Sequence, residues 1–373
     1  MTLALGCLPL LAWIYLLFGR GWFWLTRERD DRAEPEPRAW PSVVAVVPAR
    51  NEADVIARSV SSLLAQDYRG PYRIVLVDDQ SDDGTADAAR ALADDRLEIL
   101  CGTSRPSGWT GKLWALKQGA ERAGAADYLW LTDADIAHAP NNLRNLVARA
   151  EGGGLALTSL MAKLHCQSLA ERLLIPAFVF FFDMLYPFAW VNDRRRSTAA
   201  AAGGCMLIRR EALERAGGID VIRGEIIDDC AMGRLMKRQG PIWLGLTERS
   251  VSLRPYSFGD IAKMVARSAY AQLSYSPLRL AGTVAGMLVV YAAAPLLAIF
   301  ARGPAQAAGV AAWALMAAAF APMLRFYRLS PLLGAAMPVI GAIYCAFTVD
   351  SALQHWRGRG GMWKGRAQAM GRA

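Results

Sequence analysis

The chain has 373 residues, a formal net charge of +9 at pH 7 and 54% hydrophobic residues. Its mean hydropathy of +0.19 is too high for an ordinary soluble enzyme, so part of the chain is expected to lie in a membrane. Much of the positive charge flanks apolar segments, which favours attraction to anionic lipid, and the sequence contains no recognisable nucleic-acid-binding module.

The N-terminal segment Thr2–Phe18 carries no charged residue. No Lys or Arg precedes it and no small-residue cleavage site follows it, so we interpret it as an uncleaved anchor rather than a signal peptide. Arginines follow it, which predicts that the next domain is cytoplasmic. We assign the anchor to residues 1–25 and predict a charged, proline-containing linker over residues 26–41.

Strands and helices alternate in the next part of the chain. Val43–Val47 is rich in β-branched residues, as expected for a parallel strand covered on both faces. Apolar residues then recur at helical spacing between Val55 and Leu64. Further strands are predicted at Arg73–Val77, Leu97–Leu100 and Tyr128–Thr132, and helices from Thr85 and over Lys112–Ala123. This alternation predicts a doubly wound α/β sheet, in which ligands gather at the carboxyl ends of the strands.

The following part is less regular. Leu155–Leu160 and Cys205–Ile208 are predicted strands, and Arg209–Ala216 begins a helix. Between them, Leu173–Val191 is rich in aromatic residues but contains two prolines, so we do not expect it to span a membrane. Aromatic residues in such a pattern are more often part of a core, and an interfacial helix that admits a lipid tail is the alternative.

Three uncharged segments near the C-terminus, Leu280–Phe300, Pro304–Leu324 and Leu329–Val349, are long enough to span a bilayer core of ~30 Å. We therefore divide the rest of the chain into a cytoplasmic domain (42–277), C-terminal membrane segments (278–350) and a basic tail (351–373). Three full spans would place the basic tail outside, against the cytoplasmic bias of Lys and Arg. Because Leu329–Val349 contains prolines and glycines, we predict that it is re-entrant or interfacial and that the tail is cytoplasmic.

Polar motifs mark the ends of the predicted strands. Asp133-Ala134-Asp135 closes the apolar run Tyr128–Leu131. Two carboxylates so placed can hold Mg²⁺ or Mn²⁺ against the diphosphate of a nucleotide sugar. An Asp after a strand is also a common turn or cap residue, so the other motifs are needed to decide. In chain order these are Pro48–Glu52, Asp78-Asp79, Gly111-Lys112, Gly203-Gly204 and Asp228-Asp229.

Taken together, these motifs resemble those of the family 2 glycosyltransferases of the GT-A fold, which use nucleotide sugars and invert the anomeric centre. The resemblance covers about Val43 to Tyr275. Around Phe178–Asn192 and Ser257–Pro277 the chain is most similar to the hopanoid-biosynthesis-associated branch. The resemblance implies an α/β fold with a GT-A-type doubly wound mixed sheet, which lies in the sequence between N-terminal and C-terminal membrane helices. It also implies a multi-pass protein of a bacterial-type cytoplasmic membrane, and the absence of paired C-x-x-C cysteines fits a reducing compartment.

Three residues are expected to bind the nucleotide of the donor. Asn51 and Glu52 can hydrogen-bond its base and ribose, as the resemblance also implies. Asp79 can accept from a uracil-type N–H, so the expected donor is a UDP-sugar. The alternative for Asp79 is an acidic turn capped by Ser81 and Thr85, and Asp78 is expected to stabilise that turn.

Three further residues are expected near the diphosphate. Lys112 can neutralise phosphate charge, and a solvated lysine at the start of a helix is the alternative. By resemblance, Asp133 is the family's ribose or metal-shell aspartate. Asp135 corresponds to the family's ligand for a divalent metal, Mg²⁺ or Mn²⁺.

The acceptor side is expected to contain the remaining motifs. Gly203 and Gly204 allow close approach of the backbone to the sugar or acceptor, or are merely a turn. Asp229 corresponds to the family's general base, and Asp228 stands in place of the usual glutamate. With an ordinary pKa near ~4, Asp229 would be ionised at neutral pH. An exposed acidic first turn of a helix is the alternative.

The sequence lacks the Gln-x-x-Arg-Trp motif of processive polysaccharide synthases, so we predict a single sugar transfer. The predicted function is transfer of one sugar to a lipid acceptor, with a hopanoid as the candidate. Transfer to a polyprenyl phosphate is an alternative that needs no base, because a phosphate acceptor is already ionised. A non-catalytic membrane scaffold is a third possibility, which the full set of expected carboxylates argues against.

Overall fold

The computed structural model describes residues 2–359, 362–363 and 366–367. The chain folds into two compact units, each built from separate parts of the sequence. The sheet unit contains Glu28–His165 and Trp190–Pro255, and the helical unit contains residues 2–27, Cys166–Ala189 and residues 256–359. These units do not coincide with the predicted domains, because residues 166–189 and 256–277 pack within the helical unit. Part of the predicted basic tail, including Lys364, lies outside the described residues.

Eight strands form one mixed sheet in the order β3-β2-β1-β4-β7-β6-β8-β5. Their bounds are β1 (Val43–Ala49), β2 (Tyr72–Asp78), β3 (Leu97–Cys101), β4 (Tyr128–Leu131), β5 (Ile136–His138), β6 (Leu157–Lys163), β7 (Met206–Arg209) and β8 (Ile242–Ser252). The neighbouring strands β3, β2, β1 and β4 are parallel to one another, and β6 is parallel to β8. The strand β7 is antiparallel to both β4 and β6, and β5 is antiparallel to β8. The predicted α/β fold with a mixed sheet is confirmed.

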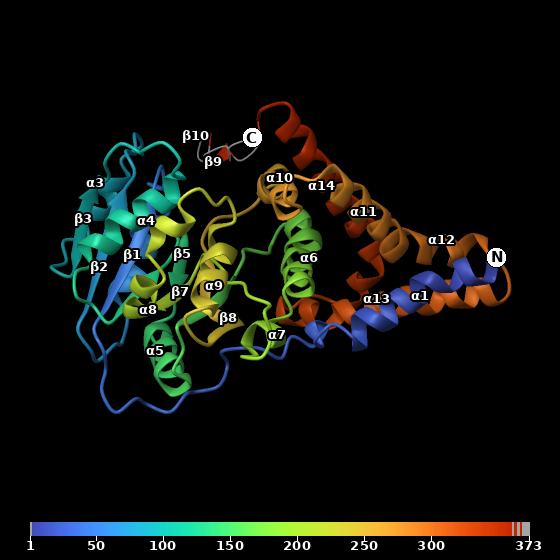
Figure 1. The fold of residues 1–373 in the computed structure, drawn as a ribbon, viewed down its shortest axis with the longest axis horizontal. Helices are drawn as coiled ribbons and strands as arrows, with labels where there is room; N and C mark the ends of the chain where they lie inside the picture. Colours follow the sequence, from blue (N-terminus) through green and yellow to red (C-terminus); the bar gives the residue numbers. More distant parts are fainter. Residues whose placement is uncertain (1, 360–361, 364–365, 368–373) are drawn as a thin grey trace. The chain divides into compact units, whose positions relative to one another are not determined.

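Helices cover both faces of this sheet (Figure 1). The helices of this unit are α2 (Ile56–Leu64), α3 (Thr85–Arg90), α4 (Gly111–Arg122), α5 (Asn142–Gly153), α8 (Arg210–Arg215) and α9 (Asp228–Lys237), and a 3₁₀ turn lies at Ile219–Ile222. The short helix α7 (Phe188–Asn192) begins in the helical unit and ends in the sheet unit. Val43, Ala45 and Val47 belong to the core that includes residues of α2 and α5. Val46 faces α4, where a Cβ on Gly119 would lie only 2.3 Å from it. As predicted, β1 is buried on both faces.

The chain order reverses between β1 and β4. From β1 the chain continues to β2 and then β3 on one side, whereas β4 pairs with the other side of β1 in the register Val46↔Leu131. The polar loops that follow β1 and β4 therefore begin side by side. In open α/β sheets, ligands bind in the crevice at such a switch point.

The helical unit consists of long apolar helices. They are α1 (Thr2–Phe18), α6 (Leu169–Leu185), α10 (Phe258–Gln272), α11 (Pro277–Met287), α12 (Ala293–Phe300), α13 (Pro304–Phe326) and α14 (Met337–Trp356), with a π-helical turn at Leu288–Ala292 and 3₁₀ turns at Phe23–Leu25 and Pro331–Ala336. Among the described residues, three continuous helical stretches are long and apolar enough to cross a membrane: Pro277–Phe300, Pro304–Phe326 and Pro331–Trp356.

Two topology predictions stay open. The apolar part of α1 is shorter than these stretches, so an N-terminal span remains a prediction. Leu329–Val349 lies largely within the helix Pro331–Trp356, which is long enough to cross a membrane. Its re-entrant or interfacial position therefore remains a prediction, which rests on its prolines and glycines and on the charge of the tail.

Aromatic side chains hold the helical unit together. Phe180 of α6 is 1% exposed, and its ring lies 5.2 Å from that of Phe320 on α13. The Tyr344 hydroxyl of α14 donates to the Leu174 carbonyl of α6 at 2.7 Å. Helix α1 lies beside α13 (Figure 1), and the Trp13 indole N–H donates to a carbonyl in the π-helical turn. The interpretation of the aromatic segment as core is confirmed for Phe180.

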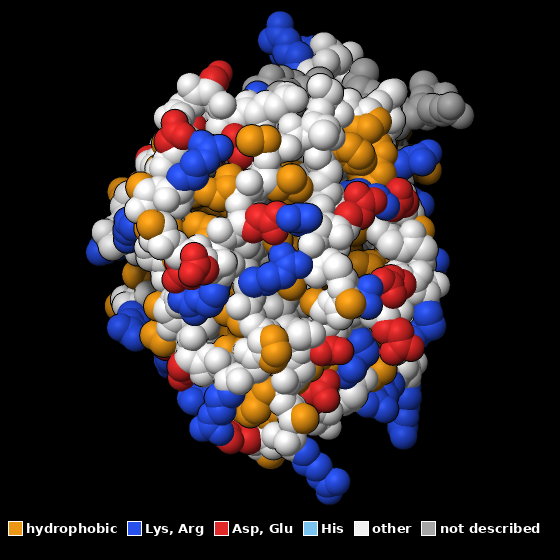
Figure 2. All heavy atoms as spheres, turned by 90° about the vertical axis from the view of Figure 1, so that its left-hand side faces the viewer, with side chains coloured by type: hydrophobic (Ala, Val, Ile, Leu, Met, Phe, Trp, Pro, Cys, Tyr) orange, Lys and Arg blue, Asp and Glu red, His pale blue; other side chains and the backbone are white. Residues whose placement is uncertain are grey.

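The face shown in Figure 2 carries Lys and Arg side chains interspersed with Asp and Glu, and hydrophobic side chains are scattered between them. Opposite charges that alternate in this way produce no extended positive field on this face. The net charge of +9 is therefore not gathered there into a basic patch of the kind that binds nucleic acid.

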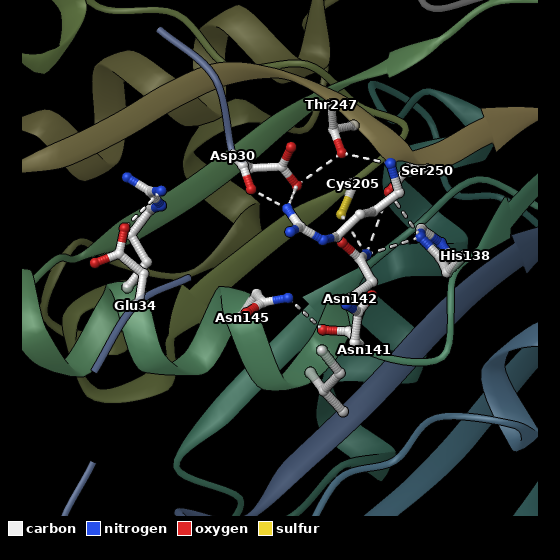
Figure 3. Close-up of polar contacts among 12 residues, drawn as sticks. Asp30, Glu34, His138, Asn141, Asn142, Asn145, Cys205, Thr247 and Ser250 are labelled. Atoms are coloured by element: carbon white, nitrogen blue, oxygen red, sulfur yellow. Dashed lines mark hydrogen bonds and ion pairs between the residues drawn. The ribbon is translucent and has the colours of Figure 1, made fainter. Parts of the chain in front are cut away.

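The predicted linker has no helix or strand but is fixed to the sheet unit. The Leu246 N–H donates to the Glu28 carbonyl at 2.8 Å, and the Asp30 N–H donates to the Leu246 carbonyl at 3.1 Å. The Asp30 carboxylate lies 3.0 Å from the Arg249 guanidinium and accepts from the Thr247 hydroxyl at 2.7 Å (Figure 3). Residues 28–30 are therefore bound along β8.

Candidate active site

The loops after β1 and β2 are interlocked. Asn51 has a positive φ of 53°, a conformation that asparagine tolerates better than most residues. Its N–H donates to the Ser81 hydroxyl at 3.0 Å, and the Glu52 N–H donates to the Thr85 hydroxyl at 2.8 Å. The Asn51 side-chain oxygen accepts from the Asp82 N–H at 3.2 Å. Ser81 and Thr85 thus position the loop that carries the two predicted nucleotide-binding residues.

Asp78 and Asp79 have different surroundings. Asp78 accepts from the Ser81 N–H at 3.3 Å, which confirms its predicted role in the turn. Asp79 is 1% exposed, and its carboxylate lies 4.0 Å from the Arg50 guanidinium. Arg50 also donates to the backbone carbonyls of Asp79 and Gln80. Recognition of a base by Asp79 remains a prediction.

Glu52 has a cationic partner that sequence reasoning missed. The Arg254 guanidinium pairs with the Glu52 carboxylate and lies 3.0 Å from that of Asp54. Arg254 is brought there by β8, since the preceding residue, Leu253, donates its N–H to the Asp135 carbonyl at 2.8 Å. Glu52 and Arg254 are 202 positions apart, and no local pattern indicates such a contact.

Asp135 lies in acidic surroundings. Burial, followed by the nearby charges of Asp133 and Glu52, raises the pKa of Asp135 to about 6, although Arg254 opposes this. A bound cation would offset this excess of negative charge, so the donor set fits a divalent metal. The described residues contain no group of three or more His, Cys, Asp or Glu side chains arranged to hold a metal. Phosphate oxygens of a substrate would therefore complete the coordination, as is usual for Mg²⁺.

Lys112 connects the donor side to the acceptor side. Its ammonium nitrogen lies 2.7 Å from Oδ1 of Asp133 and 3.2 Å from Oδ2 of Asp228, and its side chain is 16% exposed. Burial lowers the pKa of Lys112, but the charges of Asp133 and Asp228 raise it more, so the net shift is upward and the amine stays protonated. The alternative of a solvated lysine is therefore wrong, because two carboxylates enclose the ammonium group.

Gly203 and Gly204 form the tight turn that precedes β7. A Cβ on Gly203 would lie 3.0 Å from the Lys112 ammonium, and one on Gly204 would lie 3.3 Å from the Ala162 side chain. The Gly203 N–H donates to Oδ2 of Asp229 at 3.2 Å. The glycines therefore make a turn and also let the backbone approach the site closely; contact with substrate remains a prediction.

Asp229 lies in the first turn of α9. It accepts from the Gly203 N–H and from the Cys230 N–H, the latter at 2.7 Å. Burial and the neighbouring Asp228 raise the pKa of Asp229 to about 6, although Lys112 opposes the shift. This pKa is higher than the ordinary value near ~4 expected from the sequence. The exposed acidic helix start considered as the alternative is wrong, because Asp229 is partly buried and its carboxylate accepts two backbone hydrogen bonds.

The polar motifs thus meet as predicted. Contacts and close charges link Glu52 to Asp135, Asp135 to Asp133, and Asp133 through Lys112 to the carboxylates of α9. Residues 44–217 match the model of the family Glycosyl transferase family 2. This stretch is a glycosyl transferase family 2 domain. Its match ends before α9, so the assignment of Asp229 rests on the geometry and on the resemblance of the motif.

Two curated relatives are similar to parts of the chain. The succinoglycan biosynthesis protein ExoO of Rhizobium meliloti (strain 1021) is 34% identical over 119 residues, which is 31% of this chain and 31% of that protein. An N-acetylglucosaminyltransferase of Neorhizobium galegae is 31% identical over 194 residues, 48% of this chain and 41% of that protein. The chain thus spans less than half the length of either relative.

Among solved structures, the mannosyltransferase PcManGT from Pyrobaculum calidifontis, in complex with GDP-Man and Mn²⁺, superposes with a TM-score of 0.56 at 21% sequence identity. The match covers 95% of this chain and 99% of that one. At this identity the likeness shows the fold alone, and it confirms a GT-A-like α/β fold around the family 2 domain.

Proposed function

We propose that this chain is a membrane-bound glycosyltransferase that moves one sugar, with inversion, from a nucleoside diphosphate sugar to a hydroxyl group of a lipid. One observation carries this proposal. The Lys112 ammonium joins Asp133, on the donor side, to Asp228, beside the proposed base Asp229. A diphosphate leaving group and an acceptor hydroxyl could therefore occupy neighbouring parts of one site.

The transfer is one displacement at the anomeric carbon. The acceptor oxygen bonds to that carbon while the bond to the diphosphate breaks and the diphosphate leaves with the electron pair. Asp229, ionised above its raised pKa of about 6, takes the acceptor proton. Its hydrogen bonds from Gly203 and Cys230 orient the carboxylate. A divalent metal held by Asp135, with Asp133 nearby, would stabilise the charge of the departing diphosphate.

The acceptor class is inferred from the helices. Three apolar helical stretches long enough to cross a membrane follow the sheet unit in sequence, which favours an acceptor that resides in the bilayer. The resemblance of Phe178–Asn192 to the hopanoid-associated branch makes a hopanoid the first acceptor to test. The proposed location is a bacterial cytoplasmic membrane with the family 2 domain in the cytoplasm.

The test is incubation of the detergent-solubilised protein with separate nucleotide sugars and a total bacterial lipid extract, followed by mass spectrometry of new glycolipids. The donors include UDP-glucose, UDP-N-acetylglucosamine and GDP-mannose, because the relatives are named for different sugars. The proposal expects one new glycolipid whose mass exceeds that of a lipid by one hexose or N-acetylhexosamine unit. Sugar added to a polyprenyl phosphate would support the alternative acceptor. Nucleotide-sugar binding without any product would indicate a non-catalytic role.

A further inference from the structure

A buried polar cluster lies beside Thr132, which follows β4 and precedes Asp133. Figure 3 shows His138 of β5, Asn142 of α5, Ser250 of β8 and Cys205, just before β7, converging there. His138 is 5% exposed, and its Nδ1 lies 2.9 Å from the Ser250 hydroxyl and 3.0 Å from the Asn142 amide nitrogen. Its Nε2 lies 2.8 Å from the hydroxyl of Thr132, the residue before Asp133.

The hydrogen bonds determine where the histidine proton lies. The Thr132 hydroxyl donates its one hydrogen to the Gly204 carbonyl at 2.9 Å. The Thr132 oxygen must therefore accept from His138, which places the proton on Nε2. Nδ1 is then an acceptor facing the donors of Asn142 and Ser250. Burial lowers the pKa of His138 to about 3, so the ring is neutral at the pH of any activity measurement.

This chain of hydrogen bonds ends beside Asp229. Thr132 holds the Gly204 carbonyl at one end of the turn, and at the other end the Ala202 N–H donates to the Ser159 hydroxyl at 2.8 Å. The Gly203 N–H lies between these two fixed points and donates to Asp229 at 3.2 Å. Glycine peptides have more conformational freedom than others, so the direction of this N–H depends on what holds the turn.

We propose that His138 and Thr132 are positioning residues, which hold the Gly203-Gly204 turn so that the Gly203 N–H stabilises the ionised carboxylate of Asp229. Neither residue touches the reacting atoms. The inference rests on the proposed function of Asp229 as the base. It assigns a role to His138, for which the sequence alone indicates only an isolated surface or core residue.

The test is Thr132→Val, which removes the hydroxyl group but keeps the shape of the side chain. Without this hydrogen bond the Gly204 end of the turn loses its anchor, and the Gly203 N–H is held toward Asp229 only from the Ser159 side of the turn. We expect kcat to fall about 10-fold and KM for the donor to change by less than about 2-fold. The acid limb of the kcat profile should move up by about half to one pH unit, because a hydrogen bond to the charged carboxylate is weakened. Thr132→Ser keeps the hydroxyl group, so its kcat and the position of its acid limb should be those of the wild type.

A matched control is available on β6. Thr158 is as deeply buried as Thr132, but its hydroxyl has no hydrogen-bond partner among the described residues. Thr158→Val is the same chemical change and should leave kcat and the acid limb as in the wild type. An equal loss in both valine variants would overturn the proposal, since it would reflect only a perturbed core.

Asp229→Asn separates the failure of this inference from failure of the proposed function. If Asp229→Asn is inactive while Thr132→Val leaves kcat and the acid limb unchanged, the positioning role is wrong and the base stands. If Asp229→Asn keeps near-normal turnover, the proposed function itself is wrong. If Thr132→Val does not fold, the variants His138→Gln and His138→Met replace it. Of these two side chains only glutamine retains an N–H that can donate to Thr132. Similar acid limbs of the kcat profile in these two variants would refute the inference.

Discussion

The Lys112 ammonium nitrogen lies 3.2 Å from the Asp228 carboxylate, so an ion pair joins the first turn of α4 to the first turn of α9. The same ammonium is 2.7 Å from Asp133, at the end of β4. One buried cation from α4 is therefore shared by two carboxylates, one after β4 and one in α9. Without it their mutual repulsion would oppose both the fold of the site and the ionisation of Asp229.

Lys112→Met should therefore reduce stability as well as activity. The substitution keeps most of the apolar stem but leaves Asp133 and Asp228 without their cation, and removing one partner of a buried ion pair typically costs about 3–5 kcal/mol. Denaturant unfolding of the purified protein measures this. Lys117→Met is the control on the same helix, because its exposed pairs with Glu121 and Asp220 should contribute less than about 1 kcal/mol. Equal losses in the two variants would contradict the bridging role.

Asp229→Asn should lower turnover by about 10²–10⁴-fold, because the amide keeps the shape of the side chain but cannot take the acceptor proton. Donor affinity, measured by calorimetry, should barely change, since Glu52, Asp79 and Asp135 are intact. Asp228→Asn should reduce turnover less, through orientation rather than proton transfer. A glycosyl-enzyme intermediate trapped on the wild-type protein would disprove a single displacement.

Activity should depend on pH through Asp229. Because its pKa is raised to about 6, kcat should fall about tenfold per unit below that pH and level off above it. The contribution of Asp229 to folding stability changes with pH in the opposite direction to its contribution to activity. A carboxyl whose folded pKa exceeds the unfolded value near ~3.9 favours folding most at low pH, and this contribution is lost as pH rises through about 6. The stability of Asp229→Asn relative to wild type should thus increase from pH 4 to pH 7, and a constant difference would argue against a raised pKa.

Asp135→Ala should abolish transfer, since this substitution removes the carboxylate assigned to the metal. A chelator should inhibit the wild-type enzyme in the same way, and added Mn²⁺ or Mg²⁺ should restore activity. The measurement is the amount of glycolipid product, detected by mass spectrometry, in chelator and after the metal is added back. Full activity in excess chelator would show that Asp135 acts without a metal.

The side of the membrane that faces the C-terminus can be measured with a reporter fused there. We expect reporter activity in the cytoplasm, because Arg357 and Arg359 follow the last apolar helix and basic residues are biased to that side. A matched fusion after Arg302, between two of the apolar stretches, should report the opposite side. Reporter activity only outside for the C-terminal fusion would mean that Pro331–Trp356 crosses fully.

Several parts of the fold were predictable because they depend on local pattern. The apolar runs of β1, β2 and β4 end in polar residues, and parallel pairing brings those ends together. The strands β5 and β8 and the helix α5 were not predicted. The strand β8 includes Thr247, Glu248 and Arg249, whose partners lie elsewhere in the sequence, so it lacks a continuous apolar run.

The parts of the site that were missed depend on distant contacts. Arg254 meets Glu52 across 202 positions, and Ser250 meets His138 across 112. Such pairs are set by which strands become neighbours, which a single sequence does not reveal. The pKa of Asp229 was likewise underestimated, because it depends on burial and on the neighbouring carboxylate in the folded state.

The place of α6 in the chain limits how this protein can be shortened. The helix lies between β6 and β7 in sequence, yet its buried residues pack with α13 and α14. A truncation before Pro277, intended to give a water-soluble enzyme, would keep α6 but remove Phe320 and Tyr344. The apolar surface around Phe180 would then be open to water and prone to self-association. Biochemical preparations should therefore retain the C-terminal helices and use detergent or nanodiscs.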